Sequence, residues 1–125
     1  MWDFFTEDEL RCKGTDECNM DEEFMEMLVA LRYAYDKPMV ISSGYRDASY
    51  NQVIGGAKNS PHLFGKAVDV LVSGRDAYEL MSLAMEKGFS GIGISQRGPH
   101  DSRFIHIDTM EDSDAHPRPW VWSYK

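Results

Sequence analysis

Two histidines and one aspartate stand in or beside apolar segments, where a polar side chain needs a partner. His62 precedes the apolar run "AVDVLV" (residues 67–72), and Asp69 lies inside that run. His106 lies inside a second apolar stretch, "RFIHIDT" (residues 103–109). A carboxylate buried without a partner carries a large free-energy cost, so Asp69 needs a cation or strong hydrogen-bond donors. Either an arginine or a metal ion would satisfy it.

Strand geometry predicts which of these side chains can meet. Side chains alternate between the two faces of a strand, so His106 shares a face with Asp108. Gly65 would let the backbone turn closely and bring His62 back toward Asp69. Histidine and aspartate are ligands of Zn²⁺, and three protein ligands leave the fourth position open that catalytic zinc sites need. The spacing alone also fits ordinary structural roles for these residues.

Length and charge limit the class of protein. The 125 residues match one domain, residues 1–125, and the 42% hydrophobic residues can form one core. No apolar run approaches the ~20 residues that span a bilayer. A net charge of −8 argues against a nucleic-acid-binding surface. We expect a monomer that neither binds nucleic acid nor inserts into a membrane.

Neither the N-terminal segment nor the cysteines point to a secreted, disulfide-bonded protein. The segment "MWDFFTEDEL" lacks the positive charge and long apolar stretch of a secretory signal, so we expect synthesis in a cytoplasm. Cys12 and Cys18 have no second pair with which to form a thiolate zinc site. They are either free thiols or one disulfide that closes a short loop.

Two segments have the apolar spacing of amphipathic helices. The first, "NMDEEFMEMLVALRYAYDKP" (residues 19–38), has Asn19 and Glu22 as a possible capping box. The second runs from near Ser73 to Lys87. The predicted buried stripes are Phe24, Met27, Leu28, Leu31 and Tyr35 in the first helix, and Ala77, Leu80, Met81, Ala84 and Met85 in the second.

Short apolar runs predict the strands. They are "MVISSGYRD" up to the turn at Ser43, "AVDVLV", "GIGI" and "RFIHIDT", the last two paired through the loop "SQRGPHDS". The segment "ASYNQVIGG" predicts a short helix, and the tail "HPRPWVWSYK" is expected to pack across the domain without regular structure. The predicted fold class is therefore α+β, with helices packed against a small, mostly antiparallel sheet.

Three segments in the same order resemble one enzyme family. "SPHLFGKAVDV" (residues 60–70) resembles the Ser-x-His-x-x-Gly-x-Ala-x-Asp signature of the zinc D-alanyl-D-alanine carboxypeptidase family, which includes muramoyl peptidases, phage endolysins and vancomycin-resistance dipeptidases. "SSGYRD" and "GIGI…RFIHIDT" resemble its upstream and downstream segments. "FFTEDELRCK" and "YNQVIGGAKNSPH" are similar to its short, often phage-borne branch. The resemblance covers nearly the whole chain and implies a fold like that of these peptidases and of the Hedgehog signalling domain.

The resemblance also implies roles for single residues. His62, Asp69 and His106 match the ligands of one Zn²⁺ per chain. Arg46 matches the family arginine that binds substrate or stabilises charge on the scissile carbonyl; without the resemblance it reads as a partner for an acidic neighbour. Ser60 matches the serine of the signature and would hydrogen-bond substrate or a ligand, or would be a plain loop residue.

The general base is where the match weakens. Several family branches carry an acidic residue three positions before the last histidine ligand, and here that position is Arg103. Asp108 is the first candidate to carry the proton, since it shares a strand face with His106. Alternatively, Asp108 orients a ligand or the site arginine without moving a proton. The runners-up as base are His100 and Asp101.

The resemblance implies a single-domain zinc peptidase that hydrolyses peptide bonds in peptidoglycan stem peptides. It would be an endolysin-like cell-wall hydrolase, either an endopeptidase or a D,D-carboxypeptidase, made in a phage-infected bacterium. One alternative is a non-catalytic, zinc-containing wall-binding module, since the Hedgehog domain holds zinc without evident hydrolysis. Another is an α+β domain in which the histidines and aspartate are structural. His116 is expected at the surface, and Trp120 and Trp122 in packing.

Overall fold

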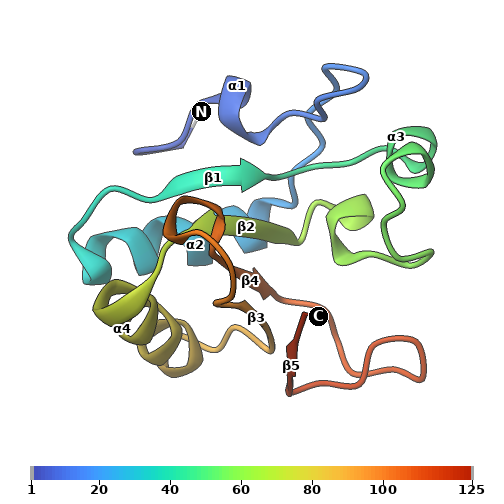
Figure 1. Cartoon of the computed structure of the whole chain (residues 1–125). Coiled ribbons are helices and arrows are strands. Elements are labelled where there is room, and N and C mark those ends of the chain that lie inside the picture. Colours follow the sequence, from blue (N-terminus) through green and yellow to red (C-terminus); the bar gives the residue numbers. More distant parts are fainter. Residues whose placement is uncertain (1, 125) are drawn as a thin grey trace.

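A five-stranded sheet forms the centre of the fold in the computed structural model, which describes residues 2–124 (Figure 1). The strands lie in the order β1 (Val40–Ser43), β2 (Ala67–Leu71), β4 (Phe104–Asp108), β3 (Gly91–Ser95) and β5 (Trp120–Ser123). Four of them pair antiparallel, and β5 runs parallel to β3. The predicted α+β class with a mostly antiparallel sheet is confirmed.

Two long helices cover one face of the sheet, and the shorter helices lie around it. The long helices contribute to a single core with the alternate residues Val68, Val70, Ile105 and Ile107 of β2 and β4. Figure 1 shows the short helix α3 (Ala48–Val53) beyond the end of β1, away from the long helix α4 (Gly74–Glu86). The helices are α1 (Glu7–Leu10), α2 (Glu22–Tyr35), α3 (Ala48–Val53), η1 (Pro61–Phe64), α4 (Gly74–Glu86) and η2 (His100–Ser102).

Alternation along the central strands separates apolar from polar side chains. Val68 and Val70 enter the core, so Asp69 between them projects from the opposite face of β2. Ile105 and Ile107 do the same in β4, which leaves His106 beside Asp69 on the face that α2 and α4 do not cover. The prediction that His106 and Asp108 share a strand face is confirmed.

One end of the first predicted helix and one face of the second need correction. Helix α2 begins after Asp21, whose carboxylate accepts from the Phe24 N–H at 2.9 Å, so the predicted Asn19 capping box is wrong. Aspartate is an equally good cap, and it stands one residue before the helix begins. Met85 is 51% exposed and lies outside the buried stripe of α4. Helix α1 was not predicted, because four residues are too few to show a periodic pattern.

The C-terminal segment forms a strand, which contradicts the prediction of a tail without regular structure. Residues 120–123 pair in parallel with β3. Two backbone hydrogen bonds extend the pairing at its ends, from Trp120 N to Ser90 O at 2.9 Å and from Tyr124 N to Ile94 O at 3.0 Å. The prolines precede the strand, and tryptophan and valine favour strands. Lys125 of the predicted tail lies outside the described residues.

Two other expectations concern the thiols and the membrane. Cys12 and Cys18 are both free thiols, which decides between the two states that the sequence allowed. Within residues 2–124, no helix has the length and hydropathy to cross a membrane.

Candidate metal centre and active site

The sheet register places Asp69 and His106 side by side. They are direct partners across the antiparallel pair β2–β4, each at the middle of its strand. Directly opposed residues on one face have Cβ atoms about 4.5–5.5 Å apart, so their side chains can share a ligand. Two segments distant in the sequence are thereby fixed by backbone hydrogen bonds.

His62 comes to the same place through the short helix η1. Ser60 caps this helix, its Oγ accepting from the His62 N–H at 3.3 Å, and Pro61 occupies the first helical position. The helix ends at Gly65, whose φ of +67° is left-handed. A Cβ at Gly65 would lie 2.0 Å from the Asn19 carbonyl oxygen, so only glycine fits this turn. The predicted turn is confirmed, and it leads directly into β2.

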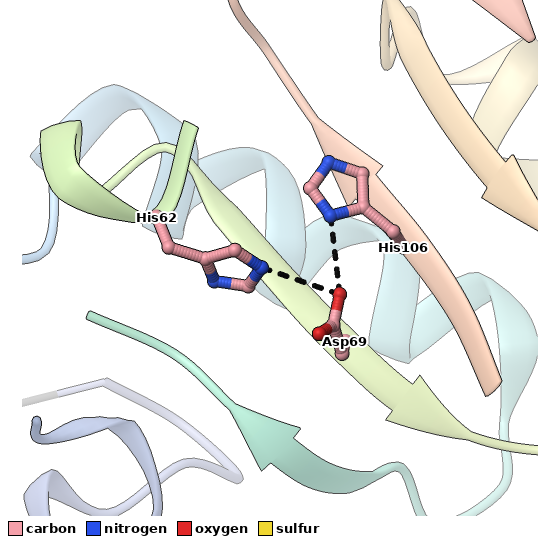
Figure 2. Close-up of side chains that lie close together, drawn as sticks. All are labelled: His62, Asp69 and His106. Carbon is pink, nitrogen blue, oxygen red and sulfur yellow. Dashed lines mark hydrogen bonds and ion pairs between the residues drawn. The ribbon is translucent and has the colours of Figure 1, made fainter. Parts of the chain in front are cut away.

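The three side chains converge on one carboxylate oxygen. His62 Nε2 lies 3.3 Å from Asp69 Oδ1, and His106 Nδ1 lies 3.1 Å from the same oxygen. Figure 2 shows both rings directed at that oxygen. One donor atom of each residue lies within 4.8 Å of the other two, and all three residues are buried. The predicted set of His62, Asp69 and His106 is therefore brought together in space.

The hydrogen bond of His62 determines which of its ring nitrogens carries the proton. Nδ1 lies 2.7 Å from the Gly44 carbonyl oxygen, which can only accept, so Nδ1 donates. Burial lowers the pKa of His62 and outweighs the opposing effect of Asp69, so the neutral ring is favoured. In that state Nε2 directs its lone pair at Asp69 Oδ1.

His106 is held in the complementary way. Its Nε2 lies 2.8 Å from Oδ2 of Asp108. Burial would raise the pKa of Asp108, but hydrogen bonds from His106 and Arg118 lower it to about 2, so the carboxylate is ionised and Nε2 donates. Nδ1 is then the nitrogen that faces Asp69. When the ring is neutral, this nitrogen also presents a lone pair.

These three donors fit a divalent cation. Two imidazole lone pairs and a carboxylate oxygen converge, and such a set is repulsive unless a proton or a metal ion lies among them. Burial lowers the pKa of His106, but the hydrogen bonds to Asp108 and Asp69 outweigh it and raise the pKa. A proton on Nδ1 therefore occupies the place in which a cation would bind. Nitrogen and oxygen ligands of this kind suit Zn²⁺.

The ligands form part of the wall of a cavity of about 400 Å³. Arg46 also lines it, and its guanidinium is fixed by Ser43 Oγ at 3.1 Å, Asn51 Oδ1 at 3.3 Å and Asp69 Oδ2 at 3.7 Å. Ser60 lines the cavity as well and is 5% exposed. Asp69 thus faces the two rings with one oxygen and the arginine with the other.

Comparison with known proteins gives this site a family. A sequence profile described as Peptidase M15 matches residues 3–108, a range that includes His62, Asp69 and His106. The chain belongs to the Peptidase M15 family. It is 36% identical over 83 residues to a zinc D-Ala-D-Ala carboxypeptidase of Streptomyces albus G, covering 65% of this chain and 32% of that protein.

A second relative is named for a different activity. The chain is 39% identical over 71 residues to the probable peptidoglycan L,D-endopeptidase MepK of Haemophilus influenzae, covering 53% of this chain and 36% of that protein. The chain thus spans about a third of the length of each of these curated relatives.

In this M15 chain, Asp108 lies behind His106 and outside the cavity. It is fully buried, and it meets the edge of the His106 ring opposite Asp69. Both its oxygens are occupied, since Arg118 and the Met110 N–H donate to Oδ1 and Arg118 and His106 to Oδ2. It is not among the described residues that line the cavity.

The runners-up for the base lie further away. His100 and Asp101 sit in η2, both are exposed, and neither belongs to the described lining of the cavity. His116 is half-buried rather than fully at the surface, because its ring donates to the Asn59 carbonyl oxygen and packs against Phe64.

Sequence reasoning missed four residues that build the site. Arg118 binds Asp108, and Asn51 binds Arg46. Trp122 of β5 and Tyr124, which follows that strand, line the cavity. Burial raises the pKa of Tyr124 to about 12, with the charge of Asp69 adding to it, so its hydroxyl keeps its proton. Only the aromatic spacing of β5 offered a sequence signal, because alternate residues of a strand share a face.

Proposed function

We propose that this chain is a zinc-dependent peptidase that hydrolyses peptide bonds in the stem peptides of peptidoglycan. The observation that carries the proposal is the convergence of His62, Asp69 and His106 at the wall of a cavity that also contains a fixed arginine. Membership of the M15 family supports it, as do the activities for which both relatives are named.

The three ligands would hold one Zn²⁺ per chain. When bound, zinc polarises the scissile carbonyl and activates water for its hydrolysis. His62 and His106 are kept in the required tautomers by Gly44 and Asp108, as described above. Orienting a ligand through its second nitrogen in this way is how proteins fix metal-binding histidines.

Arg46 is placed to bind negative charge in the cavity. Its Nε and Nη1 are occupied by Ser43 and Asn51, which orient the guanidinium without neutralising it. Asp69, at 3.7 Å, balances part of its charge. A guanidinium fixed before the reaction can stabilise charge that develops on a carbonyl oxygen, or bind a substrate carboxylate. Ser60 contributes to the same wall and caps the helix that carries His62.

For Asp108 we propose the second of the two roles that the sequence left open, namely orientation of His106. A base role would first require its contacts with Arg118 and His106 to break, since these occupy both carboxylate oxygens. Tyr124 is a hydrogen-bond donor on the cavity wall, because its pKa of about 12 keeps it protonated.

We further propose an endolysin-like role, in which the chain acts on the bacterial cell wall after synthesis in a phage-infected cell. One relative is named a zinc D-Ala-D-Ala carboxypeptidase and the other a probable peptidoglycan L,D-endopeptidase. Either specificity fits a cavity of about 400 Å³ that opens beside Arg46.

One observation favours a second function, that of a zinc-containing module that binds the wall without cutting it. Among the described residues that line the cavity, Asp69 is the only carboxylate, and it belongs to the ligand set. Peptidases of this kind need a group to move a proton to the leaving amine. A module of this sort would bind zinc and wall fragments and release no product.

Digestion of purified peptidoglycan tests the proposal. Zinc-loaded protein is expected to release new amino or carboxyl termini, detected by mass spectrometry of muropeptides, and a chelator is expected to stop the release. His62→Ala should abolish activity, whereas His100→Ala, which removes an exposed histidine outside the cavity, should retain it. Zinc and wall binding without product would favour the binding module. Equal activity in both variants would refute the metal site.

A further inference from the structure

A second layer of side chains supports the edge of His106 that faces away from Asp69. Asp108 accepts from His106, and the guanidinium of Arg118 donates twice to Asp108, from Nε to Oδ1 at 3.0 Å and from Nη2 to Oδ2 at 2.8 Å. Asp108 is fully buried, and the Arg118 side chain is 7% exposed. Two parallel charge-assisted bonds fix the plane of the carboxylate, and with it the direction in which Oδ2 accepts.

Trp122 contacts both ends of this layer. Its ring centroid lies 5.1 Å from that of His106, and the Arg118 guanidinium carbon lies 5.3 Å from the centroid of the same indole. Both are within the range of aromatic and cation–π contacts. The indole therefore packs against the imidazole and also restricts the arginine that holds Asp108.

Strand β3 leaves room for this layer through its two glycines. Gly91 pairs with Asp108, and a Cβ there would lie 2.3 Å from each oxygen of the carboxylate. Gly93 pairs with Trp122, and a Cβ there would lie 2.7 Å from the indole. No side chain other than hydrogen fits at either place without displacing Asp108 or Trp122. The Gly-x-Gly pattern of β3 thus has a steric reason.

We propose that Arg118 is a positioning residue for the metal centre. It holds Asp108 so that His106 keeps its proton on Nε2 and turns the lone pair of Nδ1 toward Asp69. Trp122 supports this arrangement by packing. The inference rests on the proposed metal role of His106. Arg118 is not among the described residues that line the cavity, so it acts through Asp108 and does not touch the substrate.

The arrangement lies partly outside the segment that defines the family. The family match ends at residue 108, and Arg118 and Trp122 follow it. Strand β5 has parallel hydrogen bonds to β3, and these bring both residues back onto the centre. The segment after residue 108 thus does more than complete the sheet, since it fixes the orientation of one ligand.

Zinc affinity in Arg118 variants of the full chain tests the proposal. Arg118→Met keeps most of the side-chain volume and removes every donor, whereas Arg118→Lys keeps the charge but cannot donate two parallel bonds. Loss of an outer partner typically weakens metal binding about 10–100-fold, which is the expected effect of Arg118→Met, with Arg118→Lys also weaker than the wild type. Arg75→Met, which changes an exposed arginine in the first turn of α4, should bind zinc like the wild type.

Competition with a chromophoric chelator measures the affinity, and ¹⁵N chemical shifts of the imidazoles report which nitrogen of His106 binds the metal. A purely structural role would lower the urea midpoint without changing either quantity. Wild-type zinc affinity and Nδ1 binding in the folded Arg118→Lys protein would overturn the proposal, and this variant decides the question even when Arg118→Met does not fold. Absence of zinc binding in the wild type would instead refute the proposed function, before any variant is compared.

Discussion

Asp69→Asn is the sharpest perturbation of the proposed metal centre, because it preserves the shape of the ligand and removes its charge. Asp69 is 8% exposed, and its Oδ1 lies 3.1 Å and 3.3 Å from the two ring nitrogens. The substitution leaves both rings in place but deprives a cation of its only anionic ligand among these three residues. Zinc should therefore stabilise the wild type and have little effect on the variant.

The size of the effect follows from binding linkage. Free zinc at 100 times its dissociation constant stabilises the folded state by about 2.7 kcal/mol. For a chain of this length, each 1 kcal/mol corresponds to roughly 3–5 °C in Tm, so the expected rise is roughly 8–13 °C. Loss of an outer partner weakens metal binding by up to about 100-fold, so removing the charge of a direct ligand should cost at least as much, and the same zinc concentration then gives at most about 0.4 kcal/mol, or roughly 1–2 °C.

Thermal unfolding followed by circular dichroism, with chelator and with zinc, measures both shifts. Asp101→Asn is the matched control, since it neutralises an exposed carboxylate in η2 outside the described cavity lining. That variant should keep the full rise in Tm. A wild type whose Tm does not change with zinc, or an Asp69→Asn protein with the same rise as the wild type, would refute the assignment of the ligands.

Three further substitutions test other parts of the site. The pKa of Asp108 is lowered to about 2 by His106 and Arg118 against the effect of burial, so its ionised form stabilises the fold above about pH 4, and this contribution disappears as the pH falls toward 2. In urea unfolding, the free energy of unfolding of Asp108→Asn should be roughly 2–3 kcal/mol below that of the wild type at pH 7, and the difference should narrow toward pH 2. A difference that stays constant with pH would exclude the charge as its cause. Gly91→Ala places a Cβ 2.3 Å from that carboxylate. It should lower the free energy of unfolding in urea by about 1–3 kcal/mol and also weaken zinc binding. Wild-type values for both quantities would contradict the close packing. Arg46→Lys should lower kcat about 10²–10³-fold on muropeptides while zinc affinity is retained, so an unchanged kcat would remove the arginine from the reaction.

The strand faces of Asp69 and His106 could be predicted because local patterns determine them. The alternation of Val68, Asp69 and Val70 fixes which face Asp69 occupies, and the same holds for His106 between two isoleucines. Burying both apolar faces against the same helices excludes a register shifted by one residue, but a shift by two would bury them equally well, so the pairing of Asp69 with His106 is known only from the structure. Gly65 supplied the remaining turn.

The C-terminal strand could not be predicted in the same way. Its pairing with β3 is non-local and parallel, and its only local signals are two tryptophans and a valine. The role of Arg118 depends on this pairing, because the arginine reaches Asp108 only when β5 is in place. A single arginine between two prolines has no periodicity from which a contact could be inferred.

The role of Asp108 was open for a related reason. The spacing of two residues in a strand places its carboxylate within reach of the His106 ring, and the observed distance of 2.8 Å agrees with that. The spacing does not say which edge of the ring it meets. Side-chain rotation decides this, and here it is fixed by Arg118, ten residues further along the chain.

The balance of charges around the centre distinguishes it from a closed structural zinc site. Each buried carboxylate has its own arginine, with Arg46 beside Asp69 and Arg118 on Asp108. Thiolate ligands neutralise the ion in many structural sites, whereas here the two histidines contribute no charge and the arginines offset both carboxylates. A divalent cation in this position would keep most of its charge. That charge, at the wall of the cavity, would favour an anionic group there, and the oxygen of an amide gains negative charge as water adds to its carbonyl.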